Sequence, residues 1–155
     1  MICNNILKGY NIKVVSGYQV YDGLYDYYLK SSDDTIYSND NTFGIAHDIF
    51  TRQSGTLKKD ILVEFKQELR GIYKDIDQNK KDISHIDILV CWSTNYEDKD
   101  KLSTEKGDIL QEKDTTTNAF YGVTHQLIEA GRQQPLPIIE LKTILEKVLN
   151  THLSK

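Results

Sequence analysis

Two short apolar runs lie in the middle of the 155-residue chain, Ile61–Phe65 and Ile86–Trp92. Each has the length and the β-branched character of a buried β-strand. Between them, four apolar residues recur at the i, i+3, i+4, i+7 spacing of an amphipathic helix: Leu69, Ile72, Tyr73 and Ile76. This pattern predicts a helix over 67–79 that connects two parallel strands by a right-handed crossover.

The N-terminal part of the chain predicts an antiparallel hairpin. Ile12–Val15 has strand character, a Ser-Gly turn follows at 16–17, and Tyr18–Leu29 is rich in Tyr, Val and Leu. Gly23 inside the second strand indicates either a bulge or a close approach of another part of the chain.

Two polar stretches, 31–59 and 93–118, interrupt this pattern and are predicted insertions. The first predicts a long loop with one short apolar piece, Ile45–Phe50. The second predicts a surface excursion without regular structure. The remaining elements are a predicted strand at 120–128, a turn at 131–134, a short strand at 138–141 and a helix at 141–150.

These elements predict one α/β domain over residues 1–155, with a mixed central sheet flanked by helices and an N-terminal antiparallel hairpin. Met1 is followed directly by domain-like sequence, so we expect a fragment of a longer protein. No stretch is long and apolar enough to cross a membrane, and residues 1–10 lack the pattern of a signal peptide. The two cysteines are too few for a disulfide framework, so a reducing, cytoplasmic setting is expected.

The formal net charge of −4 argues against a chain whose main task is to coat nucleic acid. Most of that charge lies in the 93–118 stretch, which holds seven acidic and four basic residues. The rest of the chain is close to neutral, and this remains compatible with binding to a phosphate backbone.

The first apolar run ends in the triplet Glu64-Phe65-Lys66. On a strand, alternation puts Glu64 and Lys66 on one face and Phe65 on the other. A carboxylate and an ammonium group at the end of a buried element are costly unless they are paired or functional. The alternative is a plain surface pair on an edge strand, worth about 0–1 kcal/mol.

A hairpin carrying Asp22, a strand with Glu64-x-Lys66, a helix and a further strand follow one another in this chain. This order resembles the PD-(D/E)xK nuclease superfamily, which has the restriction-endonuclease-like fold. The resemblance implies that Asp22 and Glu64 bind Mg²⁺ or Mn²⁺, with the main-chain carbonyl of Phe65 as a further ligand. It also implies that Lys66 positions or polarises the attacking water.

These residue types suit phosphodiester hydrolysis, which builds negative charge on the phosphate. A divalent cation neutralises that charge and lowers the pKa of bound water. Mg²⁺ prefers oxygen ligands and uses few carboxylates, and lysine supplies a compact positive charge.

The chain also departs from the superfamily pattern. Tyr21 stands where the superfamily often has proline before the first acid, and no N-terminal helix is evident. Asp26 lies one strand repeat beyond Asp22 on the same predicted face, and is the alternative metal ligand.

Other candidate residues lie nearby in the sequence. Gln67 follows the triplet directly and is either an accessory site residue or part of the helix start. Arg52, Lys58 and Lys59 are candidates for contact with a nucleic-acid backbone, against the default of solvated loop charges.

The sequence therefore predicts a Mg²⁺-dependent endonuclease-like domain that acts on nucleic acid, with DNA as the expected substrate. Two alternatives are a catalytically silent nuclease fold used for dimerisation or nucleic-acid binding, and an unrelated small α/β protein-interaction module. Segments 63–66 and 86–92 also resemble C-terminal domains of bacterial GHKL-type ATPases linked to restriction or phage defence. This second resemblance implies an effector fused to, or partnered with, an ATPase, and cutting both strands would favour a homodimer.

Overall fold

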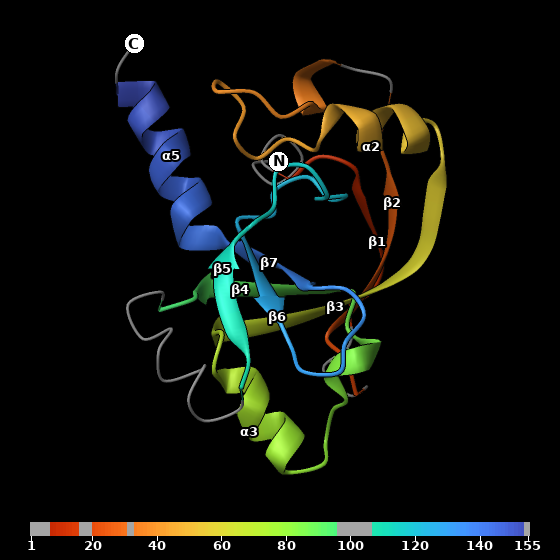
Figure 1. Cartoon of the computed structure of the whole chain (residues 1–155), viewed down its shortest axis with the longest axis vertical. Helices are drawn as coiled ribbons and strands as arrows, with labels where there is room; N and C mark the ends of the chain where they lie inside the picture. Colours follow the sequence, from red (N-terminus) through yellow and green to blue (C-terminus); the bar gives the residue numbers. More distant parts are fainter. Residues whose placement is uncertain (1–6, 16–19, 31–32, 96–106, 154–155) are drawn as a thin grey trace.

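The computed structural model of the chain describes residues 7–15, 20–30, 33–95 and 107–153. These residues form a seven-stranded mixed sheet with helices on both of its faces (Figure 1). The strands are β1 (Tyr10–Val15), β2 (Gly23–Tyr28), β3 (Leu57–Glu68), β4 (Ile88–Ser93), β5 (Ile109–Glu112), β6 (His125–Ile128) and β7 (Leu136–Glu140). The helices are α2 (His47–Gln53), α3 (Gly71–Asp77) and α5 (Leu141–Leu153), with 3₁₀ turns η1 (Asp33–Thr35) and η2 (Ile83–His85). No helix within the described ranges has the length and apolar character needed to cross a bilayer.

The strands are ordered β1-β2-β3-β4-β7-β6-β5 across the sheet. Three parallel strands, β3, β4 and β7, form its centre, and antiparallel strands lie on either side. The predicted α/β class, the antiparallel pairing of the N-terminal strands and the parallel pair around α3 are confirmed. The predicted turn at 16–17 lies outside the described residues.

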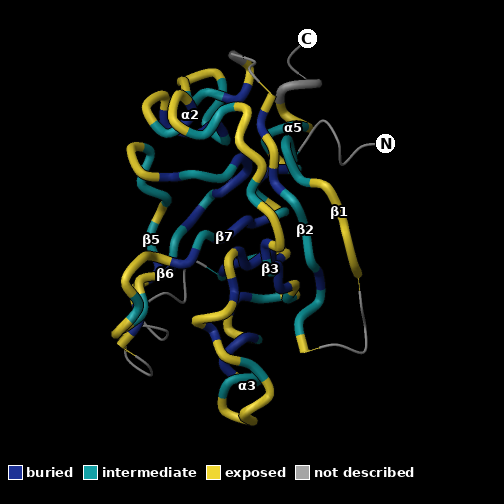
Figure 2. The backbone as a smooth tube through the Cα atoms, turned by 90° about the vertical axis from the view of Figure 1, so that its right-hand side faces the viewer, coloured by how far each residue is buried: buried dark blue, intermediate teal, exposed yellow. Residues whose placement is uncertain are grey.

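Alternation along the central strands divides the core into two layers. On one face, Ile61 and Val63 of β3 pack with Phe50 of α2 and Ile144 of α5. On the other face, the core contains the buried residues Leu69, Ile72, Tyr73, Ile83, Ile86, Leu89, Cys91, Leu110, Leu127, Leu136 and Ile138. Helix α3 therefore covers the face opposite α2 and α5, and Figures 1 and 2 show it across the central strands from these two helices.

The helix predicted over 67–79 is shorter than its apolar spacing suggests. Strand β3 continues to Glu68, which stays in register with Ser93 of β4, and α3 begins only at Gly71. The parallel ladder keeps the backbone extended for two residues beyond Lys66. Gln67 is consequently a strand residue, and its proposed role at a helix start is wrong.

The two predicted insertions contain more regular structure than their polarity indicates. Residues 31–59 include η1, α2 and the start of β3, and the buried Phe50 anchors α2 to the sheet. Residues 93–118 include β5, whose Leu110 pairs with Leu127 of β6. The strand predicted at 120–128 begins only at His125, because Gly122 has a φ of +88° and interrupts the extended backbone.

Of the two alternatives for Gly23, a bulge or a close approach, the structure shows the close approach. A Cβ atom at this position would lie 2.6 Å from Cε2 of Tyr25. The register shift between β2 and β3 falls instead between Tyr25 and Tyr27.

Candidate functional site

Glu64 is the most deeply buried acid among the described residues, with none of its surface exposed. Strand alternation directs it to the α3 face, beside Leu89 of β4. Two ammonium groups, those of Lys66 and Lys81, donate hydrogen bonds to its Oε1 atom. Among the described residues, Oε2 of Glu64 is the one buried side-chain atom without a hydrogen-bond partner. Burial of a polar atom without a partner costs free energy, so a ligand for Oε2 would stabilise the site.

Lys66 connects this carboxylate to helix α3. Its Nζ atom lies 2.9 Å from Oδ2 of Asp75, and its side chain is 16% exposed. Gly71 leaves room for the lysine stem, because a Cβ there would lie 3.3 Å from Lys66 Cδ. Burial lowers the pKa of Lys66, but the hydrogen bonds to Glu64 and Asp75 outweigh this effect, and its pKa is raised. Lys66 therefore remains a cation at neutral pH.

Asp75 is held as a carboxylate in the same cluster. The hydrogen bond from Lys66 lowers the pKa of Asp75, against a smaller opposing effect of burial, and the charges of Lys66 and Lys81 add to the lowering. A charged Asp75 fixes the ammonium group of Lys66 on the α3 side of the site.

Asp22 lies in the bend just before β2, the strand that pairs with β3, and its side chain reaches the cluster from there. Its Oδ2 atom accepts a hydrogen bond of 2.9 Å from the backbone N–H of Phe65. Its Oδ1 atom lies 3.8 Å from Nζ of Lys81, and the side chain is 36% exposed. The N–H and carbonyl of one strand residue point to the same neighbouring strand, so the Phe65 carbonyl faces the side on which Asp22 lies. The site is buried at Glu64 and open to solvent at Asp22.

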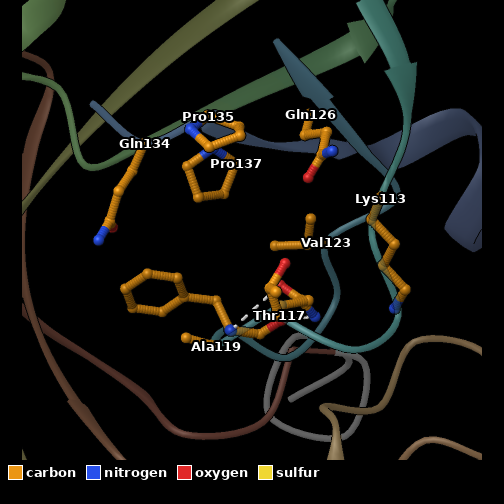
Figure 3. Close-up of a pocket in the computed structure, with 10 residues that line it drawn as sticks. Lys113, Thr117, Ala119, Val123, Gln126, Gln134, Pro135 and Pro137 are labelled. Carbon is orange, nitrogen blue, oxygen red and sulfur yellow. Dashed lines mark hydrogen bonds between the residues drawn. The ribbon is translucent and has the colours of Figure 1, made fainter. Parts of the chain in front are cut away.

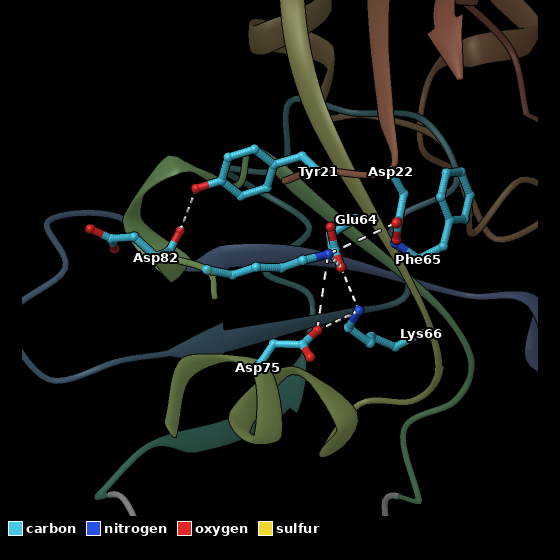
Figure 4. Close-up of polar contacts among 8 residues, drawn as sticks. Tyr21, Asp22, Glu64, Phe65, Lys66, Asp75 and Asp82 are labelled. Carbon is cyan, nitrogen blue, oxygen red and sulfur yellow. Dashed lines mark hydrogen bonds and ion pairs between the residues drawn. The ribbon is translucent and has the colours of Figure 1, made fainter. Parts of the chain in front are cut away.

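Lys81 joins the three carboxylates of the cluster. Its Nζ atom contacts Glu64 directly and lies within 4.0 Å of oxygens of Asp22 and Asp75. Figure 4 shows the carboxylates of Asp22, Glu64 and Asp75 converging, while that of Asp82 points away from them. The segment that carries Lys81 is held by Tyr21, whose hydroxyl donates to the Asp82 carbonyl at 3.3 Å.

Sequence reasoning missed two members of this cluster, Asp75 and Lys81. A weak signal for Asp75 existed, because it lies three residues after Ile72, at the edge of the apolar stripe with which α3 faces the sheet. Lys81 had no such signal. It stands beside Lys80 in a charged connection, and only the fold distinguishes the two residues.

The other candidate residues lie away from Glu64. Asp26 is 3.4 Å from Nζ of Lys13 and accepts a hydrogen bond of 3.1 Å from the N–H of Asp60. The geometry therefore places Asp22, and not Asp26, beside Glu64. Gln67 is exposed and, by alternation, points to the opposite face of β3 from Glu64.

The predicted backbone-contact residues lie near the other end of β3. Lys58 and Lys59 are about six residues before Glu64, which on a strand is on the order of 20 Å. Arg52 lies in α2, where its Nε donates to the carbonyl of Asp48. Lys58 lies over the ring of Phe120, with its Nζ 4.7 Å from the ring centroid. The structure does not bring these three cations to the carboxylate cluster.

The oxygens of Asp22 and Glu64, with the carbonyl of Phe65, form a donor set of the kind that hard divalent cations prefer. Within the described ranges, no three His, Cys, Asp or Glu side chains are arranged to hold a metal ion. A cation here would complete its coordination with backbone, water and phosphate oxygens, as Mg²⁺ commonly does. The partnerless Oε2 of Glu64 fits such a ligand.

A separate cavity of about 330 Å³ is lined by Gln126 of β6 and Pro137 of β7 (Figure 3). Its lining includes Lys113, Gln126 and Phe120, and it contains no carboxylate. Burial lowers the pKa of Lys113 to about 8, and the charge of the nearby Lys147 contributes. The cavity lacks the acids that the cluster around Glu64 provides.

No protein family, curated protein or solved structure matches the chain in the comparisons made. The geometry of the site is therefore the basis on which its function is inferred.

Proposed function

We propose that the chain is a metal-dependent phosphodiesterase domain of the restriction-endonuclease-like fold, acting on DNA. One observation carries this proposal: the fully buried Glu64, with a partnerless carboxylate oxygen, lies among Asp22, Lys66 and Asp75. Burial of this many charged groups costs free energy. Clusters of this kind are common at functional sites, where a bound cation and substrate interact with the charges.

Asp22, Glu64 and the Phe65 carbonyl would hold the cation, Mg²⁺ or Mn²⁺. When bound, the cation supplies charge neutralisation at the phosphate and a lowered pKa of water. Asp22 is the exposed end of this set, so substrate would approach from its side.

Lys66 acts as a fixed positive charge in this proposal. Burial lowers the pKa of Lys66, and its hydrogen bonds to Glu64 and Asp75 raise it by more, so Nζ is a charged donor in this site. Its ammonium group can donate hydrogen bonds to the attacking water or to a non-bridging phosphate oxygen. Asp75 holds that ammonium group in place at 2.9 Å and is thereby a positioning residue.

The test is cleavage of supercoiled plasmid by the chain in Mg²⁺ or Mn²⁺. Glu64→Ala/Lys66→Ala is the inactive comparison, and Glu68→Ala/Arg70→Ala is the matched control. The control pair lies just beyond the site, joined by a 2.9 Å surface ion pair. Cleavage by the wild type and the control, and none by a site variant that circular dichroism shows to be folded, supports the proposal. Absence of cleavage by the wild-type chain in either cation refutes it.

A second candidate function is a catalytically silent domain of the same fold. The observation that favours it is that Lys66 and Lys81 already neutralise two of the three clustered carboxylates. In that case the cluster is structural, and the domain binds nucleic acid or a second copy without cutting. Retained nucleic-acid binding with no cleavage in either cation would distinguish this function.

A further inference from the structure

The Lys81 ammonium group lies near both carboxylates that a shared cation would bind, those of Asp22 and Glu64. It lies 3.8 Å from Asp22 Oδ1 and in direct contact with Glu64 Oε1. A divalent cation that binds both carboxylates does so with oxygens at roughly 2.1 Å. The positive charge of Lys81, held beside the same two carboxylates, would compete with such a cation.

The charges of the cluster favour exchange of one cation for another. Three carboxylates, from Asp22, Glu64 and Asp75, face two ammonium groups, from Lys66 and Lys81. The cluster is therefore one unit negative with Lys81 in place. A divalent cation in the place of Lys81 would balance the carboxylates together with Lys66.

The backbone that carries Lys81 is anchored on both sides, so exchange requires only its side chain to move. Before it, the N–H of Lys80 donates to the carbonyl of Asp75 at 2.9 Å. After it, the side chain of Asp82 accepts from the N–H of Ser84 at 2.9 Å. The lysine side chain has a flexible four-carbon stem, and it is only 11% exposed in this state.

We propose that Lys81 is a tethered cation that occupies the metal position in the resting site and leaves it when a divalent cation binds. This inference rests on the metal site of the proposed function. Lys81 thereby sets the cation concentration at which the site fills. The apparent affinity for the cation is the intrinsic affinity multiplied by the fraction of sites that the lysine leaves free.

Two measurements without nucleic acid test the exchange. The first is Mn²⁺ binding by calorimetry to Lys81→Met, with Lys80→Met as the matched control at the exposed neighbouring position. We expect Lys81→Met to bind Mn²⁺ about tenfold more tightly or better, because a competing positive charge is gone. We expect Lys80→Met to match the wild type. Equal affinities in all three proteins, or no binding by any, would overturn the proposal.

The second measurement uses the wild-type chain and does not depend on whether a variant folds. Acetylation by an N-hydroxysuccinimide ester, read by mass spectrometry, reports the access of each lysine. Lys81 should be protected in K⁺ and labelled in saturating Mg²⁺ at equal ionic strength, while Lys80 is labelled in both. Continued protection of Lys81 in Mg²⁺ would contradict the exchange.

These outcomes separate the two proposals. Unmasking of Lys81 without any cleavage would refute the nuclease and leave the exchange standing. Metal-dependent cleavage with Lys81 still protected would refute the exchange alone.

Discussion

The carboxylate of Asp22 accepts a 2.9 Å hydrogen bond from the backbone N–H of Phe65, between the two charged residues of the Glu-x-Lys triplet. This bond ties the acid before β2 to the middle of the triplet on β3. Asp26, four residues later, pairs with Lys13 and the Asp60 backbone instead. The fold thus distinguishes two acids that strand alternation alone leaves equivalent.

Replacement of Glu64 by Gln should strongly destabilise the domain. The variant keeps the volume of the side chain but leaves Lys66 and Lys81 without their shared buried carboxylate. Loss of one partner from a buried ion cluster costs about 3–5 kcal/mol, so the urea unfolding free energy should fall by about that amount.

Glu68→Gln is the matched control for this change. Glu68 pairs with Arg70 at the surface, and a pair of this kind contributes about 0–1 kcal/mol. Equal unfolding free energies for the two variants would show that Glu64 is not the buried anion of the cluster.

The stability of the chain should depend on pH through Lys113. Burial, with the nearby charge of Lys147, lowers the pKa of Lys113 from 10.5 to about 8. Between about pH 8 and 10.5 the unfolded chain binds more protons at this residue than the folded chain does. The contribution of Lys113 to the unfolding free energy therefore rises with pH across this window.

The measurement is urea unfolding of the wild type and Lys113→Met at several values from pH 7 to pH 10. Other groups titrate in both proteins, so their effects cancel in the difference. The wild type should gain stability relative to Lys113→Met as the pH rises. A difference that stays constant, or falls, would show that Lys113 is not destabilised by its burial.

Cys91 should be chemically inert in the folded chain. It is buried in the centre of β4, and burial, with the charge of Glu140, raises the pKa of its thiol to about 12. Because the thiolate is the reactive form, iodoacetamide should alkylate Cys91 of a Cys3→Ser variant far more slowly in buffer than in denaturing urea. Similar rates in the two solvents would place Cys91 at the surface.

Particular residues show where the sequence was sufficient and where it was not. The central parts of β3 and β4 could be predicted from the sequence, because both of their faces are largely apolar, as is typical of central parallel strands. Strand β5 could not be predicted from the sequence. It has only four residues and lies among charged ones, and its assignment depends on Leu110 pairing with Leu127.

The charged cluster around Glu64 was also only partly predictable from the sequence. Glu64 and Lys66 stood out because a strand cannot bury them cheaply, and Asp22 followed from a resemblance to known nucleases. Lys81 reaches the cluster only because the segment after α3 turns back along the sheet. Asn79 in this segment has a φ of +53°, in the left-handed region, and nothing in the local sequence specifies which lysine then faces Glu64.

Plasmid cleavage by Asp22→Asn and Asp26→Asn tests the central claim most directly. The two changes remove the same charge from acids four residues apart, and only Asp22 lies beside Glu64 and Lys81. We expect Asp22→Asn to abolish Mg²⁺-dependent cleavage and Asp26→Asn to retain it. Equal cleavage by both variants, or loss of cleavage in Asp26→Asn alone, would contradict the assignment of the site.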